Sequence, residues 1–439
     1  MEEMIEQFCT KRTKNFFAPK SNEVIRLFKN RSVFAWCLYD TGHCAFATIV
    51  MAVVLPVYYQ TVIAGGGEWA LSSWGYASSV ALAISAVLTP VVGTYVDGRA
   101  VKKKYLLAFA ILGIAASAAL AAAGAGRWFY ALACMVTGTV GLSVASVCYD
   151  ALLSYVAPEG QMDRVSTLGY GIGYLGAGVL LAIGMVLISR FGDAGVKCSF
   201  LLVAVWWAGA AVPLALWVPE PPVGASAPVG LKQTLRALAQ SWNELKSYPE
   251  ALRFMVSFWL YNDGIGTIIR MAAVFGAGLG ISQNHIVGAM LVTQFVGVPF
   301  ALIFAHLAEK LGSKRAVMIS LGWYTLIALG SMLMTRNWHF WLMAIAVGMV
   351  QGGAQAISRS IYASMLPAGR SGHFFGLYNV SSKFAGIIGP ALCSTVASLT
   401  GSLRLAVGVI AVSFIGGMII LAGVDVDKGR ARVAHTYAK

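Results

Sequence analysis

Charged residues are scarce in this sequence of 439 residues: they make up 11% of it, whereas a soluble domain has about a quarter. Hydrophobic residues make up 58%. A water-soluble fold cannot bury that much apolar surface, so the scarcity of charge excludes an ordinary soluble protein. Apolar runs of about 20 residues, the length that crosses about 30 Å of hydrocarbon, recur from end to end. The sequence therefore predicts a protein whose solvent is the membrane.

Several motifs are also missing. The seven cysteines include no Cys-x-x-Cys pair, so we expect small buried side chains and neither a disulfide nor a metal site. There is no Gly-x-Ser-x-Gly elbow, phosphate loop or His-Glu-x-x-His motif, and the Gly-x-Gly-x-x-Gly run at 171–176 lies in an apolar stretch with no strand before it. We expect neither an enzyme nor a cofactor. Because the start of the chain has no apolar region followed by a small-residue cleavage site, the first span should remain as an anchor.

The apolar runs predict an all-α integral membrane protein with about twelve spanning helices. The expected spans are 33–60, 72–96, 105–126, 129–149, 165–189, 198–218, 254–280, 286–308, 316–335, 338–358, 374–399 and 405–424.

The basic residues indicate how the chain is oriented. If residue 1 is cytoplasmic, most of the 32 lysines and arginines fall on cytoplasmic segments. The basic residues expected on the opposite side are Arg127, Arg190, Lys197, Arg336 and Arg404. This bias predicts that both termini are cytoplasmic, as in a bacterial inner membrane protein. The net charge of +14 is therefore explained by topology, and we expect no nucleic-acid partner.

Segments of the first half recur in the second. YDALLSYVAPEG (149–160) matches SRSIYASMLPAG (358–369) at a spacing of 209 residues, and WCLYDTG (36–42) echoes WLYNDG (259–264). Six spans per half make the repeats parallel, which predicts two six-helix bundles. The expected domains are a cytoplasmic segment 1–32, a bundle 33–218, a linker 219–252 with an amphipathic helix, a bundle 253–424 and a tail 425–439.

Two loops and two long segments carry a family resemblance. The loops at 93–104 and 305–315 resemble the short cytoplasmic loop of major facilitators, and 34–59 with 351–390 resemble the bacterial relatives of the vacuolar amino-acid effluxers of autophagy. The resemblance implies the major facilitator fold and amino-acid or related efflux. In the loops it implies an acid-to-base contact that latches the two bundles. The matching positions are Gly93, Asp97, Glu309, Lys310, Gly312 and Arg315.

Few charges lie inside the spans, and each one needs a reason because a charge at the bilayer centre costs about 2.5–3.5 kcal/mol. Asp150 and Arg359 occupy equivalent positions near the ends of the fourth and tenth spans. The resemblance implies that helices one, four, seven and ten line a central cavity. We therefore expect a gate in which Asp40 and Asp150 pair with Arg359 and Lys383. The alternative is a fixed pair inside one bundle.

A proton-coupled carrier needs a carboxylate or a histidine that gains and loses a proton during the cycle. Asp40, His43 and Asp263 are the candidates, and the first two lie three residues apart on one helix face. A hydrogen-bonded core histidine is an equal alternative for His43.

Other polar residues of the spans are candidates for substrate binding, although each could instead join two helices by a hydrogen bond. They are Tyr39, Asp40, Tyr261, Asn262, Asp263, Arg270, Gln351, Gln355, Tyr378 and Asn379. Arg270 could bind an anionic group or extend to the outer interface.

The sequence thus predicts a secondary transporter that exports amino acids or similar small polar solutes by alternating access. We expect a small-molecule substrate, a lipid bilayer, a proton as coupling ion and a monomer. Two alternatives stay open: a drug or lysolipid exporter on the same fold, and a membrane receptor or scaffold that transports nothing.

Overall fold

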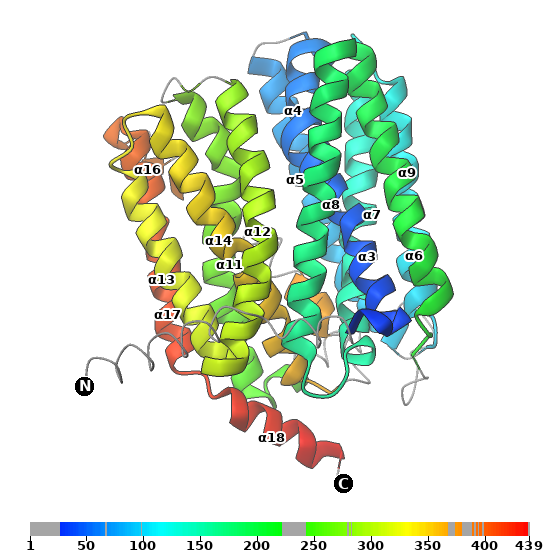
Figure 1. The fold of residues 1–439 in the computed structure, drawn as a ribbon, viewed down its shortest axis with the longest axis vertical. Helices are drawn as coiled ribbons and strands as arrows, with labels where there is room; N and C mark the ends of the chain where they lie inside the picture. The colour runs from blue at the N-terminus through cyan, green and yellow to red at the C-terminus, as the bar shows by residue number, and fades with distance from the viewer. Residues whose placement is uncertain are drawn as a thin grey trace, which may run out of the picture.

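The computed structural model describes residues 27–65, 68–97, 99–221, 243–278, 281, 283–367, 374–379, 389, 392–393, 395–396 and 399–437. The described part is helical and contains no strand (Figure 1). Nine of its helices are long and apolar enough to cross a membrane.

The first half begins with α3 (Arg31–Ala45), which continues through the π-helical η1 (Phe46–Val53), α4 (Val54–Tyr58) and the π-helical η2 (Tyr59–Ile63). It goes on with α5 (Glu68–Asp97), α6 (Lys102–Ala119), η3 (Leu120–Ala122), α7 (Trp128–Val156), α8 (Met162–Phe191) and α9 (Asp193–Trp217). The second half holds α11 (Pro249–Gly278), α12 (Gln283–Leu311), α13 (Ser313–Ser331), α14 (Asn337–Ser364), α16 (Leu403–Gly408) and α17 (Ala411–Ala422), followed by α18 (Val426–Tyr437).

Helices overlap every expected span except the eleventh, 374–399, most of which lies outside the described residues. Two of the overlapping helices, α11 and α13, are not among the nine. The main difference is length at one end. The fourth span is expected to stop at residue 149 and the tenth at 358, whereas α7 runs to Val156 and α14 to Ser364. Hydropathy marks only the lipid-facing part of a helix. The extra turns hold polar residues that pack between the two halves, so a hydropathy pattern cannot reveal them.

The first span is less regular than expected. Two π-helical stretches interrupt it, and Pro56 lies between them in α4. Because proline has no N–H to donate, a carbonyl one turn earlier loses its partner, and the helix widens locally.

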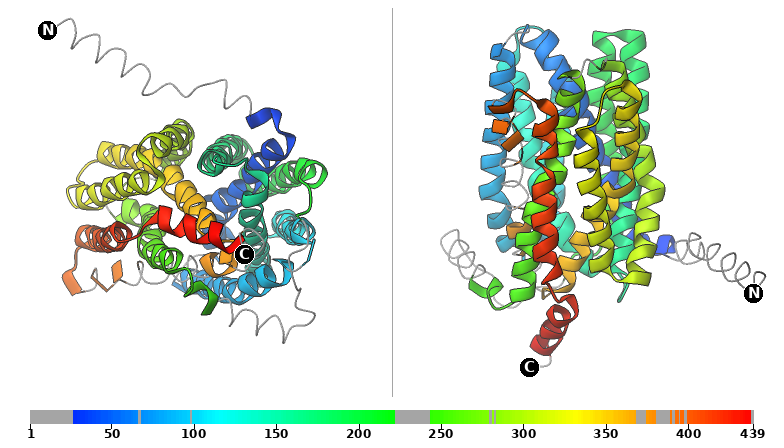
Figure 2. Two further views of the ribbon diagram at one scale, coloured as in Figure 1. Left: turned by 90° about the horizontal axis from the view of Figure 1, so that it is seen from below. Right: turned by 90° about the vertical axis from the view of Figure 1, so that its left-hand side faces the viewer.

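Each half has its own apolar core. One cluster joins α3, α5, α6, α7, α8 and α9, with Trp36, Phe46 and Trp207 fully buried. A second joins α11, α13, α14 and α17, with Phe254, Tyr324 and Phe414 fully buried. Figure 2 shows the two groups of helices side by side around a central axis. The halves meet where α8 packs on α12 and α14, and where α7 touches α14.

α3 begins and α17 ends at the same end of the molecule, called the terminal end here, where α18 lies across the helices (Figure 1). Val426 and Val433 of α18 are buried, and Arg430 Nε donates to Ser364 Oγ at 3.0 Å. α18 is therefore tied to the last residue of α14.

Candidate functional site

A cavity of about 470 Å³ lies between the two halves. Its volume is within the range of about 300–1,000 Å³ that is common for small-molecule sites. Residues of α3, η1, α7 and α8 line it from one side, and residues of α11, α12, α13 and α14 line it from the other. A solute in this cavity would therefore touch both halves at once.

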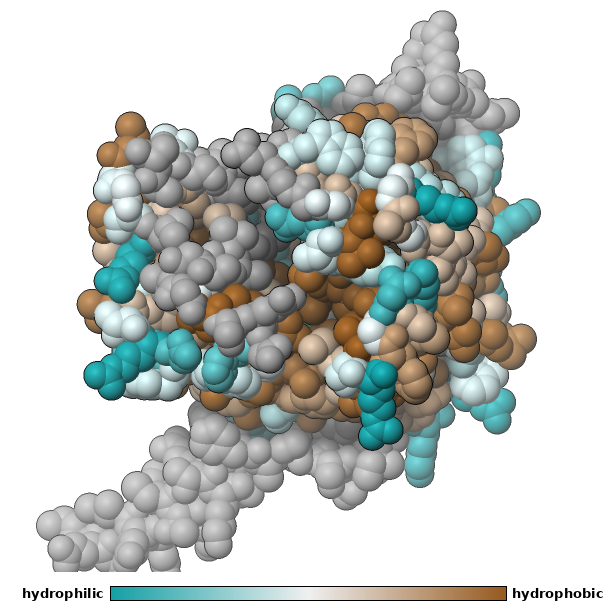
Figure 3. All heavy atoms as spheres, turned by 90° about the horizontal axis from the view of Figure 1, so that it is seen from above, coloured by the Kyte–Doolittle hydropathy of each residue, from teal (hydrophilic) through white to brown (hydrophobic). Residues whose placement is uncertain are grey.

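One stripe of α14 shows how the chemistry of the cavity changes along its depth. The lining side chains recur every three or four residues, as they must on one face of a helix. From the far end toward the terminal end they are Phe340, Met343, Val347, Gln351, Gln355 and Arg359. The wall thus changes from apolar to polar to charged. Seen from the far end, apolar side chains gather between the two halves (Figure 3).

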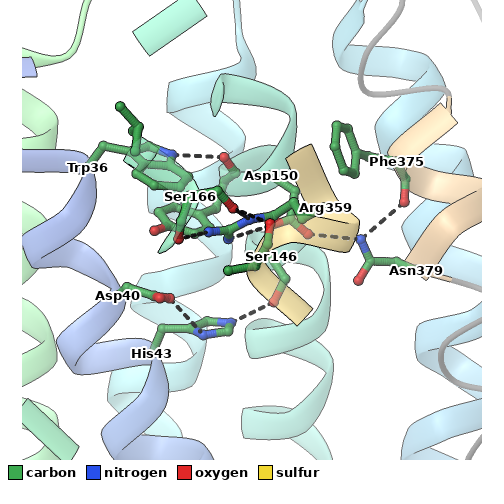
Figure 4. A network of polar contacts seen from close by, with 12 residues as sticks. Trp36, Asp40, His43, Ser146, Asp150, Ser166, Arg359, Phe375 and Asn379 are labelled. Carbon is green, nitrogen blue, oxygen red and sulfur yellow. Dashed lines mark hydrogen bonds and ion pairs between the residues drawn. The ribbon is translucent and has the colours of Figure 1, made fainter. Parts of the chain in front are cut away.

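Arg359 closes the charged end of the cavity. It is 3% exposed, and its guanidinium crosses from the second half to the first (Figure 4). Nη1 lies 3.1 Å from Asp150 Oδ1, Nε donates to Ser166 Oγ at 2.9 Å, and Nη2 donates to the Ser166 carbonyl at 3.1 Å. The fork of donors is thus shared between α7 and α8, which fixes its plane.

Three aromatic rings of the first half surround the same guanidinium. Its Cζ lies 4.8 Å from the ring centre of Trp36, 5.4 Å from that of Tyr149 and 4.6 Å from that of Tyr170. Trp36 and Tyr149 are stacked, with ring centroids 4.3 Å apart. Aromatic faces attract a cation strongly once water is excluded, so these rings help to compensate for burying the charge.

A second group of contacts joins the halves beyond Arg359, nearer the terminal end. The Asp163 carboxylate at the start of α8 accepts hydrogen bonds from Ser313 and Ser360 of the second half. Next to it, Arg164 Nη2 lies 2.6 Å from the Glu309 carboxylate. Together with Arg359, these contacts close the cavity at the terminal end.

Asp40 and His43 lie side by side on the cavity wall. His43 Nδ1 is 3.5 Å from Asp40 Oδ1, and His43 Nε2 is 2.6 Å from Ser146 Oγ. The Ser146 hydroxyl also lies 2.7 Å from the Leu142 carbonyl, and when its proton goes to that carbonyl its oxygen accepts the proton of His43 Nε2. In this arrangement the proton of a neutral His43 is on Nε2, and the lone pair of Nδ1 faces the Asp40 carboxylate.

The candidates for substrate binding divide into two groups. Asp40, Gln351, Gln355 and Asn379 line the cavity, and Asn379 Nδ2 donates to Asp150 Oδ2 at 3.3 Å. His43, Asp150 and Arg359 line it as well.

Five others lie outside the described lining, because a helix presents only one face to a cavity. They are Tyr39, Tyr261, Asn262, Asp263 and Tyr378. Tyr39 packs on Tyr149, Tyr261 hydrogen-bonds Ser358 at 2.6 Å, and Tyr378 stacks on Phe258. Asp263 Oδ1 accepts from the Gly389 amide at 3.1 Å, which joins α11 to the eleventh span.

Some predicted residues lie beyond what the structure describes. Lys383 is outside the described residues, as is most of the linker. Arg270 lies in α11 and Asp97 ends α5, but the structure describes only the backbone of these two residues.

The loop residues that match the major facilitator pattern have different surroundings in the structure. Glu309 makes the contact with Arg164 described above, whereas Gly93 is buried in α5. Lys310 and Arg315 are exposed on either side of Gly312. Gly312 has φ of +90°, a conformation that favours glycine, and it lets α13 begin directly after α12.

Sequence reasoning missed Asp163, Arg164, Ser166 and Tyr170, all in the first part of α8. The available signal was the cluster of polar residues Asp163, Arg164, Ser166 and Thr167 at the start of an apolar span, because polar side chains there must contact either water or protein.

Comparison with known proteins agrees with this architecture. The sequence model of the family described as vacuole effluxer Atg22 like matches residues 156–434. The MFS-type transporter YxiO of Bacillus subtilis is 32% identical over 399 residues, which cover 88% of this chain and 93% of that protein. Autophagy-related protein 22-1 of Phaeosphaeria nodorum is 25% identical over 81% of this chain and 76% of its own length.

Solved structures support the same fold. The human organic anion transporter MFSD10 superposes with a TM-score of 0.70 at 15% identity and covers 92% of this chain and all of that one. The proton:xylose symporter XylE gives a TM-score of 0.64 at 13% identity, over 92% of this chain and 96% of that one. The matching family is described as an effluxer and the Bacillus subtilis relative as an MFS-type transporter, so this chain is a multi-pass membrane transporter and no enzyme. The chain belongs to the vacuole effluxer Atg22-like family of major facilitator proteins.

Proposed function

We propose that this protein is a secondary transporter that moves small amphipathic solutes by alternating access, with apolar amino acids as the leading cargo. The observation that carries the proposal is the central cavity, which both halves line and which one set of contacts between the halves closes. In this proposal the halves 33–218 and 253–424 move as bodies against each other.

The change from apolar to charged side chains along the cavity face of α14 supports an apolar amino acid as the cargo. Arg359, Asp150 and Asn379 would receive the charged groups of an amino acid, and Gln351 and Gln355 would bind beside them. The apolar side chain would then lie against residues such as Val347, Met343 and Phe340. A strongly polar solute would find no hydrogen-bond partners on that apolar wall. The names of the relatives in this family support efflux as the direction.

The contacts around Arg359 support the gating part of the proposal. All of them join one half to the other, so they must break if the terminal end is to open. The distribution of basic residues predicts that this end is cytoplasmic, which makes the present state outward-facing. Linkage to a proton through Asp40, His43 or Asp263, a bacterial inner membrane and a monomer stay predictions.

The part of the cavity nearer the far end favours a second kind of cargo, a drug or a lysolipid. Met271, Phe275, Met290, Met334 and Phe340 line it, and flexible methionine walls accept varied apolar shapes. A drug or lysolipid exporter would use such a wall.

Flux into proteoliposomes tests the proposal. The panel contains leucine, phenylalanine, serine, glutamate and a lysophospholipid, each supplied at two pH gradients, with liposomes free of protein as the control. We expect leucine and phenylalanine to move several times faster than serine or glutamate. Preference for the lysophospholipid would support the second cargo. If nothing moves, the protein is not a transporter of these solutes, and a receptor or scaffold becomes the better explanation.

A further inference from the structure

Three side chains with metal-binding atoms lie together on the cavity wall. Asp40, His43 and Cys44 stand at positions i, i+3 and i+4 of α3, hence on one face, and their ligand atoms all lie within 4.8 Å of one another. Around a tetrahedral ion with bonds of about 2.0–2.3 Å, ligand atoms are roughly 3.3–3.8 Å apart. The distance of 3.5 Å between His43 Nδ1 and Asp40 Oδ1 already fits.

The hydrogen bonds around His43 orient it as a ligand. When the Ser146 hydroxyl donates to the Leu142 carbonyl, it accepts the His43 proton on Nε2, and the lone pair of Nδ1 then faces the carboxylate oxygen of Asp40. Two acceptors repel at this distance unless a proton or a metal ion lies between them. A hydrogen bond from the second ring nitrogen is also the usual support of a metal-binding histidine.

Asp40 has a further atom without a partner. Its side chain is 3% exposed, and Oδ2 has no hydrogen-bond partner among the described residues. A Cβ built on Gly173 of α8 would lie 3.0 Å from this oxygen and 2.8 Å from Cys44 Sγ. The oxygen and the sulfur therefore both pack against Gly173, which brings them to the same side of the group. A buried carboxylate oxygen without a partner is costly, and a bound cation would remove that penalty.

The charges of the neighbourhood fit a divalent ion. Asp150 and Arg359 offset each other across the gate. One carboxylate and one thiolate would then neutralise two positive charges, which suits a site with little water. Nitrogen, sulfur and one oxygen favour zinc or a similar transition ion over calcium or magnesium.

We propose that Asp40, His43 and Cys44 form a binding site for one zinc-like divalent ion in the central cavity. Binding replaces the S–H bond of Cys44 by a metal–sulfur bond and releases that proton to water. The fourth position of the ion faces the cavity, where a water molecule completes the tetrahedron. The sequence predicts no metal site because its cysteines form no Cys-x-x-Cys pair, and the site is independent of the cargo proposed above.

Titration with Co²⁺ alone tests the site. The purified full chain, stripped of metal by a chelator, should bind one Co²⁺ and develop the near-ultraviolet band of a cobalt–thiolate bond. Cys44→Ser should abolish the band. Cys198→Ser, which removes an exposed thiol of α9, should leave band and affinity unchanged. Ser146→Ala keeps all three ligands and should weaken binding by about ten- to a hundred-fold, since it frees the histidine proton.

X-ray absorption of the zinc-loaded wild type provides a test that needs no variant. We expect one sulfur at about 2.3 Å together with nitrogen or oxygen ligands at about 2.0–2.2 Å. A shell without sulfur would overturn the proposal. So would the absence of a thiolate band, its survival in Cys44→Ser, or its loss in Cys198→Ser.

Discussion

Arg359 Nη1 lies 3.1 Å from Asp150 Oδ1, and the two residues are 209 positions apart. That number is the spacing of the internal repeat, so the base of one half meets the acid that stands at its own equivalent position in the other half. Such a contact lies on the axis that relates the halves. It can form only while the terminal ends of α7 and α14 are together, which makes it a natural reporter of the closed state.

The buried ion pair predicts a strong coupling between its two members. Asp150→Asn leaves the Arg359 charge without its carboxylate, and Arg359→Gln does the reverse, so each should destabilise the protein by about 3–5 kcal/mol. The double variant removes both charges and should lose clearly less than the sum. Thermal unfolding in detergent measures this. Additive losses would mean that the residues act separately.

A charge reversal of the same pair tests the gate. Asp150→Arg or Arg359→Asp alone should stop flux, and the two together should restore part of it. Full recovery is not expected, because a carboxylate at 359 would face the electron-rich rings of Trp36 and Tyr170. Failure of any rescue would count against this pair as the gate.

The polar part of the cavity wall, where Gln355 lies, predicts an effect on substrate affinity. Gln355 lines the cavity and Tyr174 OH donates to its Oε1 at 3.4 Å, so Gln355→Leu should raise KM for an amino acid several-fold while the protein stays folded. Gln60→Leu is the matched control, since Gln60 is exposed and outside the lining. Equal effects of both changes on KM would argue against a cargo site at Gln355.

Close helix packing predicts which glycines resist substitution. A Cβ on Gly141 of α7 would lie 2.7 Å from the Phe109 carbonyl oxygen and 2.8 Å from the Gly113 nitrogen of α6. Both are backbone atoms, so Gly141→Ala should lower stability by about 1–3 kcal/mol. Nothing lies within 4 Å of the corresponding position at Gly209 of α9, and Gly209→Ala should cause no loss. The melting temperatures of the two variants give the comparison.

Sequence alone predicted the membrane fold, because twenty-residue apolar runs and a long repeat are robust signals. Together with the family resemblance, the repeat predicted a gate of Asp40 and Asp150 with Arg359 and Lys383. Of these, Asp150 contacts Arg359, Asp40 lies beside His43, and Lys383 is outside the described residues.

The aromatic rings around Arg359 could not be predicted. Trp36, Tyr149 and Tyr170 come from three helices, and their approach depends on how α3, α7 and α8 rotate about their own axes.

Rotation also explains the candidates that lie away from the cavity. Tyr39 and Asp40 are neighbours in sequence, yet a helix turns by about 100° between them, so only Asp40 lines the cavity. The spacing of a repeat carries no information on that angle.

A cross-link across the closed end tests alternating access most directly. Asp163→Cys with Ser313→Cys, made in a Cys198→Ser background, places two thiols where α8 and α13 touch. A short bifunctional thiol reagent should join them, stop flux in proteoliposomes, and release it again when the link is cleaved. The matched control, Asp193→Cys with Lys197→Cys, lies within α9 and should leave flux unchanged when linked. Flux that continues at its original rate through a fully linked 163–313 pair would contradict the account.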